Sequence, residues 1–193
     1  MKKSRLEAFS DGVIAIIITI MVLELRVPHA PTLAALQPLL PVFASYVVSF
    51  VYVGIYWNNH HHLWQAVDHV NGPVLWANLH LLFWLSLFPF VTSWAGESGF
   101  ATVPVAIYGV VLLCAGAAYT ILVRSLVGLH GRNSLLARAV GADFKGNMSL
   151  LLYSAAIALA FLQPWLSCAL YVVVAIIWLV PDRRIERILT SKS

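Results

Sequence analysis

The sequence predicts an all-α membrane protein with six transmembrane helices per subunit and both termini in the cytoplasm. Hydrophobic residues make up 61% of the 193 residues and charged residues only 10%, and the mean hydropathy is +0.85. Soluble domains are about 45–50% apolar and about 25% charged, so the excess apolar surface must face lipid. The apolar residues also fall into six runs, most of them near the ~20 residues that cross a bilayer.

The six predicted spans are residues 6–25, 39–57, 74–94, 102–123, 148–162 and 165–180. The last two are short and meet at Gln163-Pro164, which predicts a tight hairpin. Five spans with one re-entrant piece are the alternative. Residues 1–193 then form a single transmembrane domain, with no room for a soluble domain.

Basic residues set the orientation of these spans. Six spans place eleven of the twelve on one side: Lys2, Lys3, Arg5, Arg124, Arg132, Arg138, Lys145, Arg183, Arg184, Arg187 and Lys192. The opposite side carries only Arg26. Because Lys and Arg favour cytoplasmic loops, we expect a multi-pass protein of the cell (inner) membrane. The N-terminus superficially resembles a signal peptide, but Glu7 and Asp11 interrupt it, so we expect a retained first helix.

Two further segments are expected at the membrane surface. Residues 182–189 place Ile185, Ile188 and Leu189 at helical spacing among basic residues, and Leu135, Leu136 and Val140 are predicted to behave similarly. Aromatic residues near span ends predict interfacial anchors: Trp57, Trp64, Trp76, Trp94, Trp165 and Tyr171.

The first span differs from the others because it carries Arg5, Asp11 and Glu24. Ionisable groups in a membrane normally face protein or water, so we expect this helix in the interior with little lipid contact. At ~100° per residue, one face collects Gly12, Ile16, Thr19, Ile20 and Leu23. Simple packing is the alternative explanation of this apolar stripe.

Ser10 and Asp11 lie on another face of the first span. The helical projection places Asp11 about 140° from Ile16. A carboxylate there needs hydrogen-bond donors. A purely structural role for Asp11, with its hydrogen bonds made inside the protein, is the alternative. The candidate donors around the second and third spans are Asn58, Asn59, His60, His61, His62, Asn78 and His80.

The histidine cluster around residue 60 suggests metal binding or proton sensing. Adjacent histidines point in different directions on a helix, and no second ligand set at metal spacing supports them. We therefore expect no metal site, and a structural role beside the first span is favoured over proton sensing.

Other function classes fit less well. The net charge of +4 reflects residues at span ends, so nucleic-acid binding is not expected. No nucleophile–base pair or paired carboxylates occur at membrane depth, so we predict neither an enzyme nor a cofactor. A secondary transporter or proton-coupled carrier stays as the alternative to a channel, although broken helices and repeats are not evident.

The sequence Arg5-x-x-x-Phe9-Ser10-Asp11 resembles the R-x-x-x-F-S-D signature of the transmembrane protein 175 family in its short prokaryotic form. The segments Gly12–Ile16 and Val22–Leu25 are also similar to that family, as is Trp57-Asn58-Asn59-His60-His61. The resemblance implies a potassium-permeable channel, a homotetramer in the lipid bilayer that also admits other monovalent cations. The first helix of each subunit would line the pore.

The resemblance also implies roles for particular residues. The family has no re-entrant carbonyl filter, and no T-V-G-Y-G occurs here. Rings of large aliphatic side chains narrow its pore, at positions that match Ile16, Ile20 and Leu23, with a hydroxyl ring at Thr19. Arg5, Phe9, Ser10 and Asp11 would hold helices together. Apart from the resemblance, the position of Glu24 at the extracytoplasmic end of the first span predicts a ring of carboxylates at the pore mouth, and an exposed Glu24 paired with Arg26 is the favoured alternative.

Overall fold

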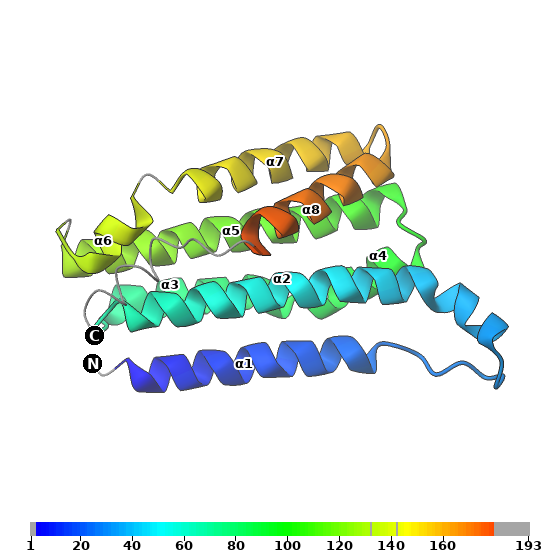
Figure 1. The fold of residues 1–193 in the computed structure, drawn as a ribbon, viewed down its shortest axis with the longest axis horizontal. Coiled ribbons are helices and arrows are strands. Elements are labelled where there is room, and N and C mark those ends of the chain that lie inside the picture. The colour runs from blue at the N-terminus through cyan, green and yellow to red at the C-terminus, as the bar shows by residue number, and fades with distance from the viewer. Residues whose placement is uncertain (1–2, 132, 142, 180–193) are drawn as a thin grey trace.

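The computed structural model describes residues 3–131, 133–141 and 143–179. In this part of the chain the long helices run side by side, and α1 lies at one edge (Figure 1). The elements are α1 (Ser4–Leu23), η1 (Leu33–Leu39, a 3-10 helix), α2 (Leu40–Gln65), α3 (Gly72–Ser86), α4 (Phe88–Glu97), α5 (Thr102–His130), α6 (Leu135–Val140), α7 (Phe144–Ala160) and α8 (Pro164–Leu179). The predicted surface helix at residues 182–189 and the basic residues Lys2, Arg132, Arg183, Arg184, Arg187 and Lys192 lie outside the described residues.

The chain is an all-helical membrane protein in its described residues. Four helical segments have the length and hydropathy to cross a bilayer, at residues 4–23, 33–65, 72–97 and 102–130. The apolar helices α7 and α8 are shorter, with 17 and 16 residues. They pack against each other as a hairpin, so the turn predicted at Gln163-Pro164 is confirmed.

The third apolar segment is not one continuous helix. It divides at Leu87 into α3 and α4, and Pro89 occupies the first turn of α4. Proline lacks the backbone N–H for a helical hydrogen bond, and its ring clashes with the preceding turn. The single span predicted over residues 74–94 is therefore two helices.

Two predictions about the membrane surface are wrong. Leu136 is fully buried in the hydrophobic core, so α6 does not lay this side chain on the headgroups. Trp64 and Tyr171 are also buried rather than interfacial. Tyr171 lies near the middle of α8, where its hydroxyl donates to the carbonyl of Val105 (3.1 Å).

Hydroxyl groups join α2, α4 and α5 inside the bundle. Thr92 donates to Ser49 Oγ (2.6 Å), and Ser49 shares a hydrogen bond with the Tyr108 hydroxyl (2.8 Å). These buried polar groups are satisfied by one another, so they add specific contacts between helices without an unpaired group.

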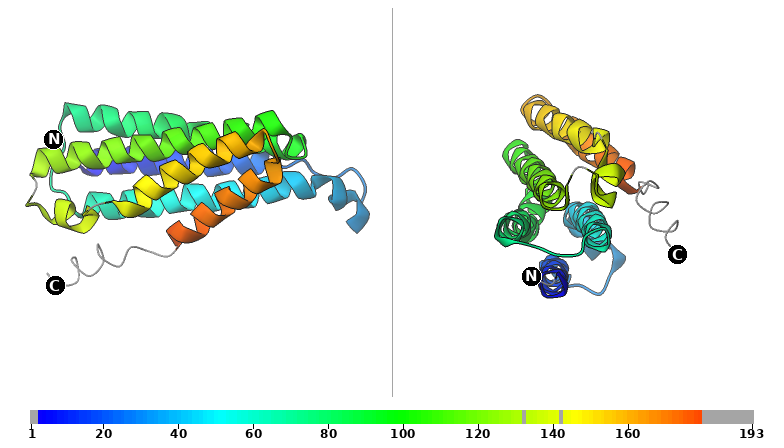
Figure 2. Two further views of the ribbon diagram at one scale, coloured as in Figure 1. Left: turned by 90° about the horizontal axis from the view of Figure 1, so that it is seen from above. Right: turned by 90° about the vertical axis from the view of Figure 1, so that its left-hand side faces the viewer.

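Helix α1 packs against α2, α3 and α4 at the rim of the bundle. The end-on view in Figure 2 shows α1 outside the other helices, with neighbours on one side only. The prediction of an interior first helix is therefore wrong for the single subunit. The face of α1 away from the bundle is available to another copy of the chain or to lipid.

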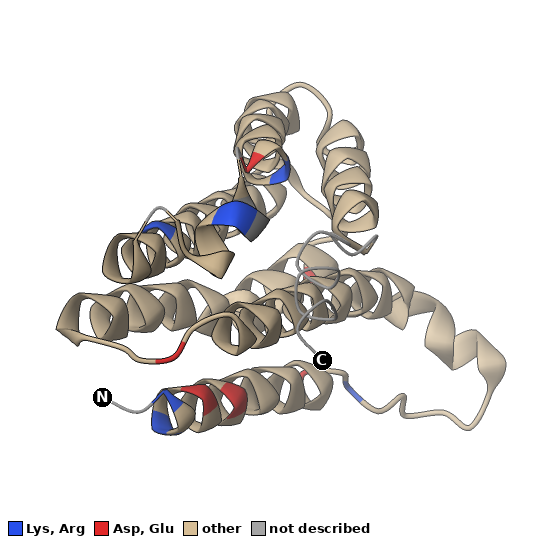
Figure 3. Cartoon of the chain, turned by 60° about the vertical axis from the view of Figure 1, so that its left-hand side comes forward, with Lys and Arg blue, Asp and Glu red and all other residues tan. Residues whose placement is uncertain are grey.

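Charged residues gather near helix ends and in loops, and the middles of the helices carry almost none (Figure 3). The exception is the first half of α1, where Glu7 and Asp11 are within the helix. Their surroundings therefore decide how α1 is held.

Candidate functional site

Helix α1 has two faces with opposite environments. Its buried residues recur at helical spacing: Leu6, Ser10, Ile14, Ile17 and Met21. Spacings of three and four residues place them on one side of the helix. This side faces α2, α3 and α4, and the opposite side is exposed along its length.

The predicted pore-lining residues all lie on the exposed side. Ile16, Ile20 and Leu23 expose 59%, 41% and 75% of their surface. Gly12 and Thr19 share this exposed side, and a Cβ added at Gly12 would meet no atom within 4 Å. The structure thus brings the stripe predicted from helical periodicity onto one free surface of the subunit, here called the α1 stripe (Gly12, Ile16, Thr19, Ile20 and Leu23).

Thr19 is the one hydroxyl in the α1 stripe. Its side chain donates to the carbonyl of Ala15 one turn earlier (2.9 Å). The hydrogen is therefore occupied within the helix, and the oxygen lone pairs remain as acceptors. The group is suited to contacting a cation or a water molecule.

A buried polar network fastens the opposite side of α1. Asn78 on α3 donates to Ser10 Oγ (2.9 Å), and the Ser10 hydroxyl donates to the carbonyl of Leu6 (2.8 Å). The Asn78 side-chain oxygen pairs with His60 Nε2 on α2 (2.8 Å). Trp64 Nε1 donates toward the His60 ring and lies 3.0 Å from Nδ1 and 2.9 Å from Nε2. Ser10, Asn78, His60 and Trp64 are almost completely buried, so this network fixes three helices relative to one another.

His60 lies between Asn78 and Trp64 in this network. The Asn78 amide nitrogen donates to Ser10, so its oxygen accepts from His60 Nε2–H. The indole N–H of Trp64 lies within hydrogen-bond distance of both ring nitrogens of His60, and the two rings meet edge to face. His60 therefore joins Asn78 on α3 to Trp64 on its own helix.

Asp11 does not bind the donors predicted for it. Its carboxylate accepts a hydrogen bond from the indole Nε1 of Trp57 on α2 (3.1 Å). Of the predicted donors, Asn78 binds Ser10 and His60 binds Asn78 instead. Ser10, one residue earlier, points toward α3, which places it and not Asp11 within reach of Asn78.

Two further contacts hold the first half of α1. Glu7 lies 3.5 Å from His61 Nδ1, and the Lys3 ammonium donates to the carbonyls of Trp64 and Val67 (2.7 Å to Val67). These carbonyls lie at the C-terminal end of α2, where a positive charge is favourable. Charged side chains at the start of α1 therefore contact α2, in addition to the neutral network.

The motif residues Arg5 and Phe9 have a different environment from Ser10 and Asp11. Both are exposed, and helical geometry places Phe9 about two turns and Arg5 about three turns before Ile16, on the same side of the helix. Among the described residues, the Arg5 guanidinium has no hydrogen-bond or ion-pair partner. Within one subunit, Ser10 and Asp11 thus bind neighbouring helices, whereas Arg5 and Phe9 extend the exposed surface.

The remaining predicted polar residues do not join this network. Asn58 is exposed, Asn59 donates to the carbonyl of Ile55 (2.8 Å), and His80 accepts from Trp84 on its own helix (2.9 Å). His62 contacts the ring of His61. No group of three His, Cys, Asp or Glu side chains within the described ranges has a geometry that could hold a metal ion.

Glu24 follows α1 at the end opposite to Lys3. Arg26, its suggested partner, instead forms an ion pair with Glu97 (3.1 Å). Glu24 is exposed and lines an open groove with Ile20, next to Glu97 and Ser93 of α4. The Glu24 carboxylate therefore lies directly after the last turn of α1, next to the α1 stripe.

Sequence reasoning missed Trp57, Trp64 and Lys3 as contacts of the first helix. The two tryptophans were assigned to the membrane interface because they lie near a predicted span end, but α2 continues to Gln65. Their spacing from His60 and His61 is one helical turn, and this was the available signal. For Lys3, the sequence predicted only the orientation of the helix in the membrane, because the position of a lysine does not indicate which group it will contact.

Comparisons with known proteins agree with this arrangement. The family described as "Endosomal/lysosomal potassium channel TMEM175" matches residues 5–89. A protein named as a potassium channel from Chryseobacterium sp. (strain P1-3) is 57% identical over 187 residues, 97% of each chain. Another from Streptomyces collinus is 35% identical over 126 residues, 61% of each chain.

A solved structure is also similar over nearly the whole length. It is titled as a lysosomal potassium-selective channel TMEM175 homolog from Chamaesiphon minutus, with a TM-score of 0.81 and 28% identity. The match covers 93% of this chain and 97% of the other. The matched region includes the R-x-x-x-F-S-D residues, the α1 stripe and the Ser10–Asn78–His60 network, so the chain belongs to the TMEM175 family.

Proposed function

We propose that the protein is a potassium-permeable cation channel, a homotetramer in which α1 of each subunit lines the pore. The observation that carries this proposal is the α1 stripe, an exposed apolar face on a helix whose other side is fixed by a buried polar network. The relatives named as potassium channels and the similar solved structure support the same assignment.

A ring of subunits gives the α1 stripe a function. Repeated rotation of one subunit about an axis brings identical faces together at that axis. Four α1 helices there would surround a conduit with rings of Ile16, Ile20 and Leu23. Arg5 and Phe9, exposed in the single subunit, would then meet neighbouring subunits and stabilise the assembly.

The aliphatic rings explain both gating and ion preference. A narrow apolar ring controls passage by excluding or admitting water. It supplies no dipoles to replace the hydration shell, so the ion that loses water most easily passes best. Potassium holds its shell less tightly than sodium, which gives moderate potassium-over-sodium selectivity. The Thr19 oxygens would replace part of the lost hydration.

The topology that goes with this channel has six spans in one domain covering residues 1–193. The spans are the four helical segments at residues 4–23, 33–65, 72–97 and 102–130, together with the two helices α7 and α8 of the hairpin. The distribution of Lys and Arg then puts both termini in the cytoplasm of a cell whose inner membrane holds the channel. Glu24 would face the extracytoplasmic mouth.

Glu24→Gln is expected to lower inward conductance about two- to threefold at ~20 mM salt, with little effect at 1 M, because salt screens the attraction of exposed charges for cations. Single-channel recordings at several salt concentrations would measure this change. Asp68→Asn is the matched control, since Asp68 is an exposed acid in the loop between α2 and α3. Equal losses at low and high salt would exclude Glu24 as a mouth charge.

Purified protein in planar bilayers tests the function itself. We expect discrete current steps in potassium chloride and a reversal potential that favours potassium over sodium. A secondary transporter or proton-coupled carrier would give saturable, coupled uptake without steps. A mass measurement of the particle would test the subunit number independently, and any value other than four would contradict the proposed assembly.

A further inference from the structure

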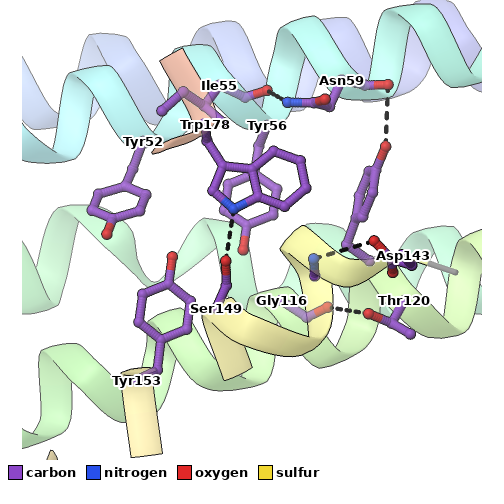
Figure 4. A pocket seen from close by; sticks show the side chains of 12 residues that line it. Tyr52, Ile55, Tyr56, Asn59, Gly116, Thr120, Asp143, Ser149, Tyr153 and Trp178 are labelled. Atoms are coloured by element: carbon purple, nitrogen blue, oxygen red, sulfur yellow. Dashed lines mark hydrogen bonds between the residues drawn. The ribbon is translucent and has the colours of Figure 1, made fainter. Parts of the chain in front are cut away.

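A small cavity lies inside each subunit, away from the α1 stripe. It lies between α2, α5, α7 and α8, is partly open, and has a volume of about 40 Å³. One water molecule needs about 10–15 Å³ of such volume, so the cavity holds about three water-sized groups. Its walls include Tyr52, Tyr56, Asn59, Tyr119, Asp143 and Tyr153 (Figure 4). We call it the tyrosine cavity.

Tyr56 directs a polar group into the tyrosine cavity. Its side chain is 91% buried, since only 9% of its surface is exposed. Its hydroxyl has no hydrogen-bond partner among the described residues, although its ring packs against Phe88 and Tyr119. The hydroxyl opens onto the cavity, where it can bind a water molecule or an ion.

The other polar groups of the tyrosine cavity present mainly acceptor oxygens. The Asn59 amide nitrogen donates to Ile55, and the hydroxyl of Thr120 donates to the carbonyl of Gly116 (3.0 Å). Ser149 donates to the carbonyl of Lys145 (2.8 Å) and accepts from Trp178. Because these donors are occupied within the protein, lone pairs remain toward the cavity.

Asp143 supplies negative charge at the edge of the tyrosine cavity. It lies just before α7 with φ of 43°, and one of its carboxylate oxygens accepts from the backbone N–H of Gly146 (3.2 Å). Asp143 and Thr120 also line an adjoining open pocket with Arg124 and Asn147. The carboxylate therefore stands between the buried space and an opening at the surface.

These properties select one chemical class of ligand. None of the residues lining the cavity, all of them described, is Lys, Arg or His, and the faces of aromatic rings attract cations. A single carboxylate is too little charge for a divalent ion, which prefers several such ligands. We propose that the tyrosine cavity binds one small monovalent cation of the size of potassium or ammonium, held by Tyr56, Asn59 and Asp143.

Binding of the ion would hold the α7–α8 hairpin against α2. Tyr56 and Asn59 belong to α2, whereas Asp143 and Ser149 belong to the start of α7. An ion between them would join the hairpin to the helix that also carries His60 and Trp64. Since the cavity exists only in the folded subunit, the ion would stabilise that state.

Thermal unfolding of the full-length oligomer in detergent tests this site. Wild type is expected to unfold about 5 °C higher in saturating potassium chloride than in N-methyl-D-glucamine chloride of equal ionic strength. Tyr56→Phe, which removes only the hydroxyl, and Asp143→Asn, which keeps an acceptor for Gly146, should each lose this increment. Tyr46→Phe, a tyrosine of α2 outside the cavity, should retain it.

Crystals grown with thallium(I) in place of potassium provide the direct measurement. We expect an anomalous peak within ~3 Å of Tyr56 Oη in every subunit and its loss in Tyr56→Phe. Ordered water alone at this position would overturn the proposal, as would an unchanged potassium increment in both variants. Peaks on the symmetry axis report separately on the proposed pore, so either proposal can fail while the other stands.

Discussion

Replacing Ile16 with Asn is expected to raise single-channel conductance by about tenfold and to bring the potassium-over-sodium permeability ratio close to one. The tenfold rise corresponds to lowering the permeation barrier by about 1.4 kcal/mol. Ile16 is 59% exposed at the centre of the α1 stripe. An amide ring there would hold water and offer oxygen ligands, so a sodium ion would no longer have to lose its shell. Bi-ionic reversal potentials in planar bilayers measure the ratio.

The matched control for Ile16 is Val22→Asn. Val22 is also an exposed, β-branched residue of α1, but helical geometry turns it about 120° from Ile16. Its substitution should leave conductance and selectivity unchanged in the assembled channel. Unchanged currents in Ile16→Asn, in a variant that assembles normally, would remove Ile16 from the constriction.

Replacing Asn78 with Ala is expected to destabilise the subunit by about 2–4 kcal/mol. Asn78 is completely buried and bonds to both Ser10 and His60. Its loss would leave the His60 Nε2–H unpaired and would remove the donor to Ser10, besides creating a cavity between α1, α2 and α3. The unfolding temperature of the purified protein should fall by roughly 5–15 °C.

Asn58→Ala is the control for this substitution, because Asn58 is an exposed asparagine on the neighbouring helix. Its effect should stay within about 0.5 kcal/mol. Since the network lies on the side of α1 away from the stripe, the Asn78→Ala channels that still assemble should keep the wild-type ion preference. Equal stability of the two variants would show that the network does not fix α1.

The division of α1 into two faces was predictable from the sequence because helical geometry is regular. Ile16, Ile20 and Leu23 share a face at any ordinary helical twist, and the structure exposes all three. The position of the hairpin at Gln163-Pro164 was predictable for a similar reason, since proline begins a helix more readily than it continues one.

The partners of individual polar groups were not predictable. Which donor reaches Asp11 depends on the rotation of α2 relative to α1, and a change of one residue exchanges Trp57 for Asn58. Arg26 likewise pairs with Glu97, which is 71 positions away in the sequence but close in space. Such contacts follow from helix packing, which periodicity within one helix does not define.

The tyrosine cavity gave no sequence signal either. Its walls come from four helices, and tyrosines in apolar runs are usual in membrane proteins. Only the packed arrangement shows that the hydroxyl of Tyr56 opens onto the cavity, whereas that of Tyr119 reaches the carbonyl of Asn59 (3.3 Å).

The length of α7 bears on the surrounding membrane. The 17 residues of α7 extend about 26 Å at 1.5 Å per residue, compared with about 30 Å of hydrocarbon. In the proposed six-span topology, lipid beside α7 must become thinner to avoid hydrophobic mismatch, and the energetic cost grows with acyl-chain length. The protein should therefore partition into thin, short-chain regions of a mixed bilayer.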